Sequence, residues 1–275
     1  MNITEVFTRK NRLLLKAMVS TDFKLRYQQS FLGYIWSVLK PLMLFAIMYM
    51  VFVRFLRFGA DVPHFSVALL LGIIMWNFFN ETTTGGMMSI VGHGDLLRKI
   101  YFSKYVVVIA SSMSAMINFG INFVVVVAFA LLNGVVPSLS WLIVLPIVLE
   151  LYLLSLGIAF FLSAVYVNLR DLSPIWEVVM QAGFYATPII YPVSLIASKA
   201  GEYGPLFARL DLILNPVAQM VQDARHVMIS TANPTIWEWV SNPFLKVWPV
   251  IFSLLIFLGG LKYFTVKSQY FAELV

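Results

Sequence analysis

The sequence has 275 residues, of which 60% are hydrophobic and 12% are charged, whereas a soluble domain is about 45–50% apolar and about 25% charged. This composition excludes an ordinary soluble fold and predicts a chain embedded in lipid, because so few polar groups could not cover a water-exposed surface. The net charge of +6 comes from basic residues near the ends of apolar runs, which argues against nucleic acid as a partner, and the absence of cysteine excludes disulfides and thiolate metal sites.

Residues 1–33 predict a basic amphipathic helix. Apolar side chains such as Leu14, Leu15 and Met18 recur at helical spacing among Lys and Arg. A helix of this kind tends to lie in the plane of the lipid headgroups, and packing against the cytoplasmic face of its own protein is the open alternative. The first long apolar run begins only near Pro41, so we do not expect a cleavable signal peptide.

Six apolar runs are each long enough to cross a membrane, which takes about 20 residues. They cover residues 33–58, 65–91, 105–132, 141–167, 174–191 and 245–264. Lys and Arg are concentrated on the side of the N-terminus, and the positive-inside rule therefore predicts that both termini are cytoplasmic. We expect an all-α integral membrane protein with six transmembrane helices.

The stretch between the fifth and sixth runs is interrupted by prolines, among them Pro205, Pro216 and Pro234. Broken backbone is tolerated at membrane depth only where protein or a cavity covers it, so we expect external re-entrant helices here, one of them from Asn215-Pro216 to Ile229. The chain is expected to form one domain with four parts: an interfacial helix (1–33), spans one to five (34–191), an external re-entrant region (192–244), and span six with a cytoplasmic tail (245–275).

The common catalytic and nucleotide-binding motifs are missing. The sequence has no Walker A loop, no His-Glu-x-x-His pair and no Gly-x-Ser-x-Gly elbow, and its three histidines lie in three different connections. Gly92–Asp95 matches the Gly-x-Gly-Asp pattern of intramembrane aspartyl proteases, but that chemistry needs a second aspartate inside a neighbouring span, and the sequence has none there. We therefore expect no catalytic residue, no metal site and no cofactor on this chain.

Three glutamates lie inside or near the predicted spans, where a carboxylate usually faces a cavity or a partner. Glu177 suits the first turn of a helix, where the helix dipole favours negative charge. Glu150 would either relay protons, as in a secondary transporter, or hydrogen-bond to a neighbouring helix. Glu81 belongs with Asn77 and Asn80 to a polar helix face.

Aromatic residues are abundant, with 23 Phe, 12 Tyr and 7 Trp. Most Trp and Tyr suit the two membrane interfaces, but sugars and amphiphilic chains also bind to aromatic faces. Four residues are predicted to line a substrate path: Trp76, Phe79, Tyr185 and Tyr191.

Two predicted cytoplasmic connections, Gly92–Lys104 and Asn168–Leu172, mix apolar, aromatic and charged residues. Such a mixture on an exposed loop is typical of a partner surface, and anchoring in the membrane plane is the alternative. The residues predicted to contact a partner are Asp95, Leu96, Leu97, Arg98, Lys99, Tyr101, Asn168, Arg170 and Asp171.

Six stretches occur in a characteristic order: Asp22–Tyr27, Ser30–Trp36, Lys40–Leu42, Asp95–Lys104, Asn168–Leu172 and Thr187–Pro192. In order and spacing they resemble the permease subunits of ABC transporters that export polysaccharides such as O-antigen, teichoic acid and capsule chains, and the resemblance covers nearly the whole chain.

The resemblance implies that two copies of the chain form a pore for a lipid-linked glycan, among membrane lipids. It also implies two copies of a separate cytoplasmic ATPase, which would hold the ATP and Mg²⁺. The N-terminal helix, with Lys24 and Arg26, and the segment Asp95–Lys104 would contact that ATPase.

Two alternative functions remain open. One is an ABC permease for a small drug or lipid, which would lack the continuous, sugar-wide and aromatic path that a polymer needs. The other is a proton-coupled secondary transporter that uses Glu150, and such a protein would work without an ATPase.

Overall fold

The computed structural model describes residues 8–27, 33 and 35–271, but not the side chains of 23–27. Every regular element in this part of the chain is a helix, which confirms the predicted all-α class. The longer helices are α1 (Arg9–Tyr27), α2 (Ile35–Met48), α3 (Phe65–Gly92), α5 (Tyr105–Leu132), α6 (Val144–Tyr166), α7 (Leu172–Ala186) and α12 (Pro243–Lys267). The shorter elements are η2 (Tyr49–Phe55), α4 (Gly94–Lys99), η3 (Leu139–Ile143), α8 (Val193–Lys199), η4 (Gly201–Tyr203), α9 (Gly204–Leu214), α10 (Pro216–Met228), α11 (Ile236–Trp239) and η5 (Ser268–Tyr270).

Five helical segments in the described part of the chain are long and apolar enough to cross a membrane. They are Ile35–Phe55, Phe65–Gly92, Tyr105–Leu132, Leu139–Tyr166 and Pro243–Tyr270. Each coincides with one of the predicted spans, so these predictions are confirmed as apolar helices of spanning length. The protein is accordingly a multi-pass membrane protein.

The predicted fifth span, 174–191, corresponds to the shorter helix α7 of 15 residues. At 1.5 Å per residue it is about 22 Å long, less than the roughly 30 Å of a bilayer's hydrocarbon core. The helix ends at Ala186 because Thr187 precedes Pro188, and a residue before proline is disfavoured in the α conformation. Thr187 is indeed extended, with a ψ of 136°.

The first span changes helix type along its length. α2 contains Pro41, and after Met48 the chain continues as the π-helix η2. Within η2 the guanidinium of Arg54 lies 5.7 Å from the ring centroid of Tyr49, five residues earlier. The π-helical spacing therefore aligns these two side chains where an α-helix would not.

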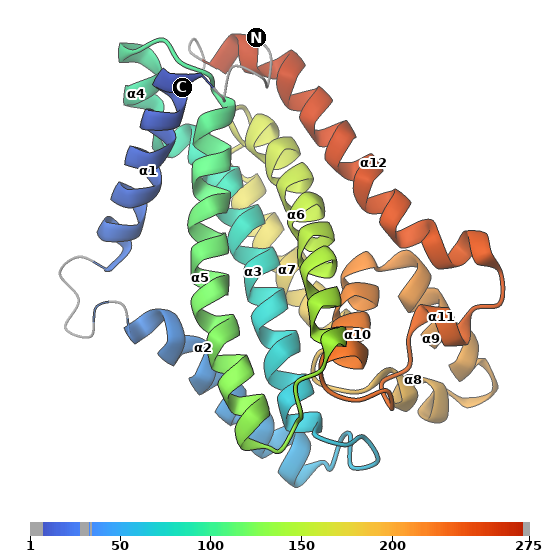
Figure 1. The fold of residues 1–275 in the computed structure, drawn as a ribbon. Helices are drawn as coiled ribbons and strands as arrows, with labels where there is room; N and C mark the ends of the chain where they lie inside the picture. Colours follow the sequence, from blue (N-terminus) through green and yellow to red (C-terminus); the bar gives the residue numbers. More distant parts are fainter. Residues whose placement is uncertain (1–7, 28–32, 34, 272–275) are drawn as a thin grey trace.

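α3 is the central helix of the bundle. It packs between α5 and α6 and also contacts α2 and α7, and Figure 1 shows α3, α5 and α6 running side by side. Gly86 allows the approach of α6, because a Cβ atom there would lie only 2.5 Å from the Cβ of Ala159. Since α3 is buried on nearly all sides, its residues face neighbours from several helices at once.

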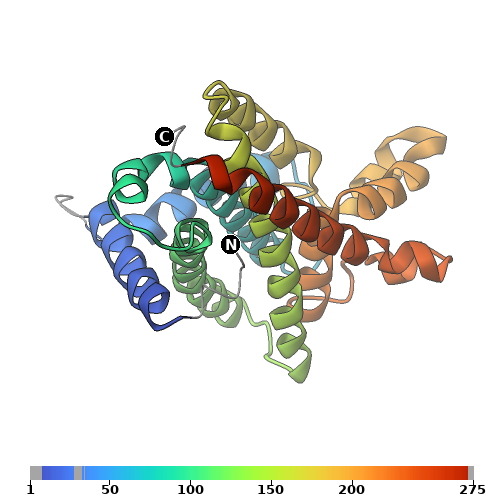
Figure 2. The same ribbon diagram turned by 90° about the horizontal axis from the view of Figure 1, so that it is seen from above.

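α12 crosses the outer side of α6 and ends at the end of the bundle where α1 starts (Figure 1). Figure 2 looks down on that end and shows α1 beside α5. We call this the α1 end. Here the ammonium of Lys10 donates a hydrogen bond of 2.8 Å to the carbonyl of Tyr101, and Asp22 lies 3.7 Å from the imidazole of His93. α1 is thus packed against its own protein.

The region predicted to be re-entrant, 192–244, consists of the short helices α8 to α11. α10 begins at Pro216 as predicted, because the side chain of Asn215 accepts a hydrogen bond from the backbone N–H of Ala218 at 3.2 Å. α10 packs against α6, α3 and α9, and α9 in turn contacts α8 and α11.

Arg225 fastens α10 to the bundle. Its side chain is 0% exposed. The guanidinium donates hydrogen bonds to the carbonyl of Ala68 in α3 at 3.0 Å and to those of Pro188 and Ile189 after α7, both at 2.6 Å. A fourth hydrogen bond of 2.8 Å reaches the amide oxygen of Gln222. A single buried side chain therefore joins three segments that are distant in the sequence.

Candidate functional site

A cavity of about 1070 Å³ lies between α2, α3, α5 and α7. It extends along α3 from Trp76 to Met88, beside α2 and most of α7. Its lining residues are Trp36, Ser37, Lys40, Pro41, Leu44, Met48, Trp76, Asn77, Asn80, Glu81, Thr84, Gly85, Met88, Asn118, Ser173, Glu177, Met180, Gln181, Phe184 and Tyr185. Lys40, Glu177 and Tyr185 are exposed, so the cavity is open on the side of α2 and α7.

The floor of the cavity is polar although it lies between apolar helices. The carboxylate of Glu81 in α3 accepts a hydrogen bond of 2.7 Å from the side-chain amide of Asn118 in α5. One turn further along α5, the amide of Asn122 donates to the backbone carbonyl of Ser37 in α2 at 3.1 Å. These contacts join α2, α3 and α5 within one turn of α5. Polar side chains inside a membrane protein usually face a cavity or one another.

One wall of the cavity is aromatic. Trp76 packs against Phe79 with ring centroids 5.5 Å apart and against Phe184 at 6.2 Å in an edge-on arrangement. Gly183 makes room for the indole, because a Cβ atom there would lie 2.7 Å from the Trp76 ring. Tyr185 follows, with its centroid 5.5 Å from that of Phe184. Rings beside amide and carboxylate groups form a surface that suits the apolar faces and hydroxyl edges of sugars.

The four residues predicted to line a substrate path divide into two pairs. Trp76 and Tyr185 line the cavity, and they are 6% and 50% exposed. Phe79 is buried beside Trp76 and is not a lining residue. Tyr191 also lies outside the lining, and its hydroxyl donates a hydrogen bond of 2.8 Å to the backbone carbonyl of Tyr185.

Sequence reasoning did not assign Lys40, Asn118, Glu177 or Gln181 to a substrate path, yet all four line the cavity. A usable signal was present in α5, where Asn118 and Asn122 occupy one helix face at a spacing of four inside a long apolar run. Glu150 is not a lining residue; it accepts a hydrogen bond of 3.4 Å from Ser253 of α12. A hydrogen bond between Glu150 and a neighbouring helix was the predicted alternative to a proton relay.

The residues predicted to contact a partner lie in α4 and in the connection between α6 and α7. In α4, Asp95, Arg98 and Lys99 are exposed, while Leu97 is buried in an apolar cluster that includes Met18 of α1. Leu96 is half-buried against the same cluster.

Tyr101 follows α4 and is 82% exposed. Asn168, Arg170 and Asp171 are exposed in the second connection, where Arg170 stacks over the ring of Tyr166 at 5.4 Å. Lys24 lies in the last turns of α1, as does Arg26, but the side chains of both residues are outside the described part of the structure.

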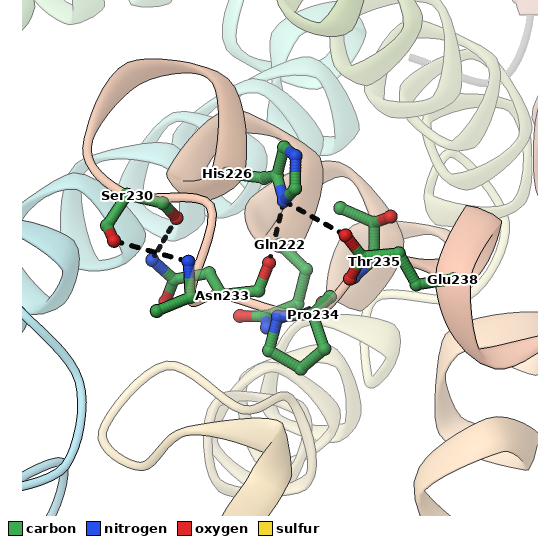
Figure 3. Close-up of polar contacts among 8 residues, drawn as sticks. Gln222, His226, Ser230, Asn233, Pro234, Thr235 and Glu238 are labelled. Atoms are coloured by element: carbon green, nitrogen blue, oxygen red, sulfur yellow. Dashed lines mark hydrogen bonds and ion pairs between the residues drawn. The ribbon is translucent and has the colours of Figure 1, made fainter.

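The three histidines lie apart, and the described residues contain no group of three or more His, Asp or Glu side chains that could hold a metal ion. His93 contacts Asp22, and His64 lies before α3. His226 contacts the loop that follows α10, as Figure 3 shows: its Nδ1 lies 2.9 Å from the carbonyl of Asn233 and 3.9 Å from the carboxylate of Glu238. These contacts hold the loop between α10 and α11 against α10.

Long apolar helices around a polar, aromatic-walled cavity define the class of this protein as a polytopic membrane protein with a cavity between its helices. The family model described as "ABC-2 type transporter" matches residues 13–202, and the chain belongs to this family. As a permease of an ABC transporter, it is a transport component and not itself catalytic.

Curated relatives narrow the comparison. The chain is 27% identical over 264 residues to an O-antigen export system permease protein RfbA of Klebsiella pneumoniae, a match that covers 95% of both chains. It is 29% identical over 212 residues to the O-antigen export system permease protein RfbA of Myxococcus xanthus, which covers 76% of this chain and 78% of the relative.

Proposed function

We propose that this chain is the transmembrane subunit of an ATP-driven exporter that moves a lipid-linked polysaccharide of the O-antigen type out of the cytoplasm. The observation that carries the proposal is the cavity, in which hydrogen-bonding side chains of α3, α5 and α7 lie beside the rings of Trp76 and Tyr185. The full-length similarity to permeases named for O-antigen export supports the same substrate class.

The energy would come from a separate ATPase subunit that binds ATP and Mg²⁺, because the sequence has no phosphate-binding loop. Two copies of that ATPase would contact the exposed side chains of α4 and of the connection 168–171. The buried face of α4 supports this role, since Leu97 packs with Met18 and the helix would transmit a push on its outer face to α1, α3 and α5.

A second copy of the chain would close the cavity. The cavity is open beside α7, whose outer face carries the exposed apolar residues Ile175, Val178 and Val179. Two copies related by a twofold axis would bury these side chains and enclose one continuous path between them.

We place the α1 end in the cytoplasm, which puts both termini on the inner side of a bacterial plasma membrane. α7 and the turn after it would then form the fifth of six crossings, and α8 to α11 would be re-entrant helices near the outer surface. The hydrogen bonds of Arg225 to the carbonyls of Pro188 and Ile189, which follow α7, would satisfy this broken backbone at membrane depth.

The proposal is tested in membrane vesicles that contain the chain with its ATPase and a fluorescent polyprenyl-diphosphate-linked glycan. We expect ATP-dependent movement of the glycan with both subunits and none with the chain alone. Trp76→Ala should slow movement about tenfold without changing the amount of assembled complex. Phe161→Ala is the matched control, because Phe161 is exposed on α6 and is not a lining residue.

Two outcomes would favour the alternatives. Rapid, ATP-dependent movement of a small lipophilic dye but not of the glycan would indicate a drug or lipid permease. Proton-driven flux through the chain alone, abolished by Glu150→Gln, would indicate a secondary transporter. The position of Glu150 against Ser253, away from the cavity lining, does not favour the latter.

A further inference from the structure

Charged side chains are few in the cavity and are not balanced. Among its described lining residues the charged groups are Lys40 in α2, Glu81 in α3 and Glu177 in α7. Two carboxylates therefore face the same space as one ammonium group, and they approach it from opposite helices. The described lining therefore has one carboxylate more than it has ammonium groups.

Two of these charges are available to a solute. Lys40 and Glu177 are exposed, and neither makes a hydrogen bond or an ion pair with any described residue. Glu81 differs, because Asn118 already donates to its carboxylate. Lys40 and Glu177 are thus the charges that a passing glycan meets most directly, and Glu81 adds the second carboxylate.

The remaining polar groups of the lining are uncharged. Asn77, Asn80, Thr84 and Gln181 offer amide and hydroxyl groups, which both donate and accept hydrogen bonds as sugar hydroxyls do. The described lining contains no arginine, the side chain that binds carboxylates and phosphates in a bidentate manner. The site is therefore equipped for hydroxyl groups and poorly equipped for anionic sugars.

We infer that the cavity selects a polysaccharide with uncharged repeating units and disfavours one that carries a carboxylate or phosphate in its repeats. This inference rests on the proposed function and narrows its substrate class. A uronate that passes about 4 Å from a fixed carboxylate is disfavoured about fivefold even in water, and more strongly beside apolar walls. Passage through the cavity repeats this penalty for every repeating unit.

The test uses inverted membrane vesicles from cells that contain the chain and its ATPase. Two probes are built on the same polyprenyl diphosphate: a linear hexose polymer, and a polymer of equal length with a uronic acid in each repeat. The ATP-dependent rate of entry is measured as protection of each probe from an added endoglycosidase. For the native chain we expect the uncharged probe to enter about tenfold faster or more.

Two variants move the ratio of the two rates in opposite directions. Glu177→Gln should lower the ratio of the uncharged rate to the acidic rate about fivefold, because the acidic probe enters faster. Lys40→Gln should raise the same ratio by a similar factor. Glu202→Gln is the matched control, because Glu202 is an exposed glutamate outside the cavity and its replacement should leave the ratio unchanged.

Equal rates for the two probes with the native chain would overturn the inference and leave the proposed function standing. A ratio that Glu177→Gln and Lys40→Gln shift in the same direction would also overturn it, since opposite charges must act oppositely. ATP-dependent entry of neither probe would overturn the proposed function itself, and the inference with it.

Discussion

Arg225 shows how much of this fold depends on one polar residue. Burial lowers the pKa of its guanidinium to about 9, so the side chain remains charged at neutral pH while it is enclosed by protein. Its hydrogen bonds to three backbone carbonyls and to Gln222 replace the water that it loses. The carbonyls of Pro188 and Ile189 also gain a hydrogen-bond donor, because they follow the end of helix α7.

Replacing Arg225 with Met should destabilise the purified protein by about 3 kcal/mol or more, because three buried carbonyl groups would lose their donor. The expected result is a fall in melting temperature in detergent and a loss of the monodisperse species on size exclusion. Arg209→Met is the matched control, since Arg209 is exposed on the neighbouring helix α9. Equal melting temperatures for the two variants would contradict the role assigned to Arg225.

The sequence placed Arg225 in an external connection but could not reveal its burial. Its partners are backbone carbonyls of residues about 36 to 157 positions away, and every residue type has such a carbonyl. The same limit applies to Trp76 and Phe79. Both lie on α3, a helix buried all round, so apolar periodicity does not indicate which of them faces the cavity.

At the scale of elements, the crossing of α6 and α12 has no room for side chains. A Cβ atom at Gly157 would lie 2.4 Å from the Cα of Phe257, and one at Gly260 would lie 2.0 Å from the carbonyl oxygen of Gly157. The two backbones are therefore in direct contact, as is common where small residues meet between membrane helices.

Gly260→Ala should force α12 away from α6 and lower the melting temperature in detergent by several degrees, because the new methyl group would meet backbone atoms that cannot move aside alone. Gly259→Ala is an internal control one residue away. A Cβ atom at Gly259 meets nothing within 4 Å, so this change should be neutral or slightly stabilising through its higher helix propensity. Equal melting temperatures for Gly260→Ala and Gly259→Ala would contradict a direct backbone contact between α12 and α6 at Gly260.

The long elements were predictable because their physical cause is local. A run of about 20 apolar residues has to form its backbone hydrogen bonds within itself in lipid, and the predicted span 105–132 coincides with α5. The fifth span was predicted too long, since its apolar composition continues through Ile190 although the helix stops at Ala186. Pro188, which ends α7, is visible in the sequence, but apolar composition alone does not show that the helix stops there.

At the scale of the whole molecule, the structure gathers the start of α1, α4 and the start of α7 at one end of the bundle (Figure 1). A partner that binds α4 would act on α3 and α5, the two helices that α4 connects and that contribute to the cavity floor. Coupling between the ATPase and the glycan would require no long-range path, because α4 directly follows α3 and precedes α5.

Replacing both Asp95 and Tyr101 with Ala should weaken binding of the ATPase about tenfold, because both side chains are exposed in the proposed contact surface. Binding is measured in detergent between the purified subunits, and insertion is checked by the yield of folded protein. Lys199→Ala, at an exposed position in α8, is the control. Unchanged ATPase affinity in the double variant would remove α4 from the proposed interface.

The sequence by itself determined that this protein lies in a membrane, the approximate positions of the five long apolar helices in the described part of the chain, and which family it resembles. These properties follow from local composition and from residues in fixed order. Only the tertiary structure decided which side chains share the cavity and where Arg225 finds its partners. Such features depend on the rotation and contact of helices far apart in the chain, and no local pattern of apolar residues specifies them.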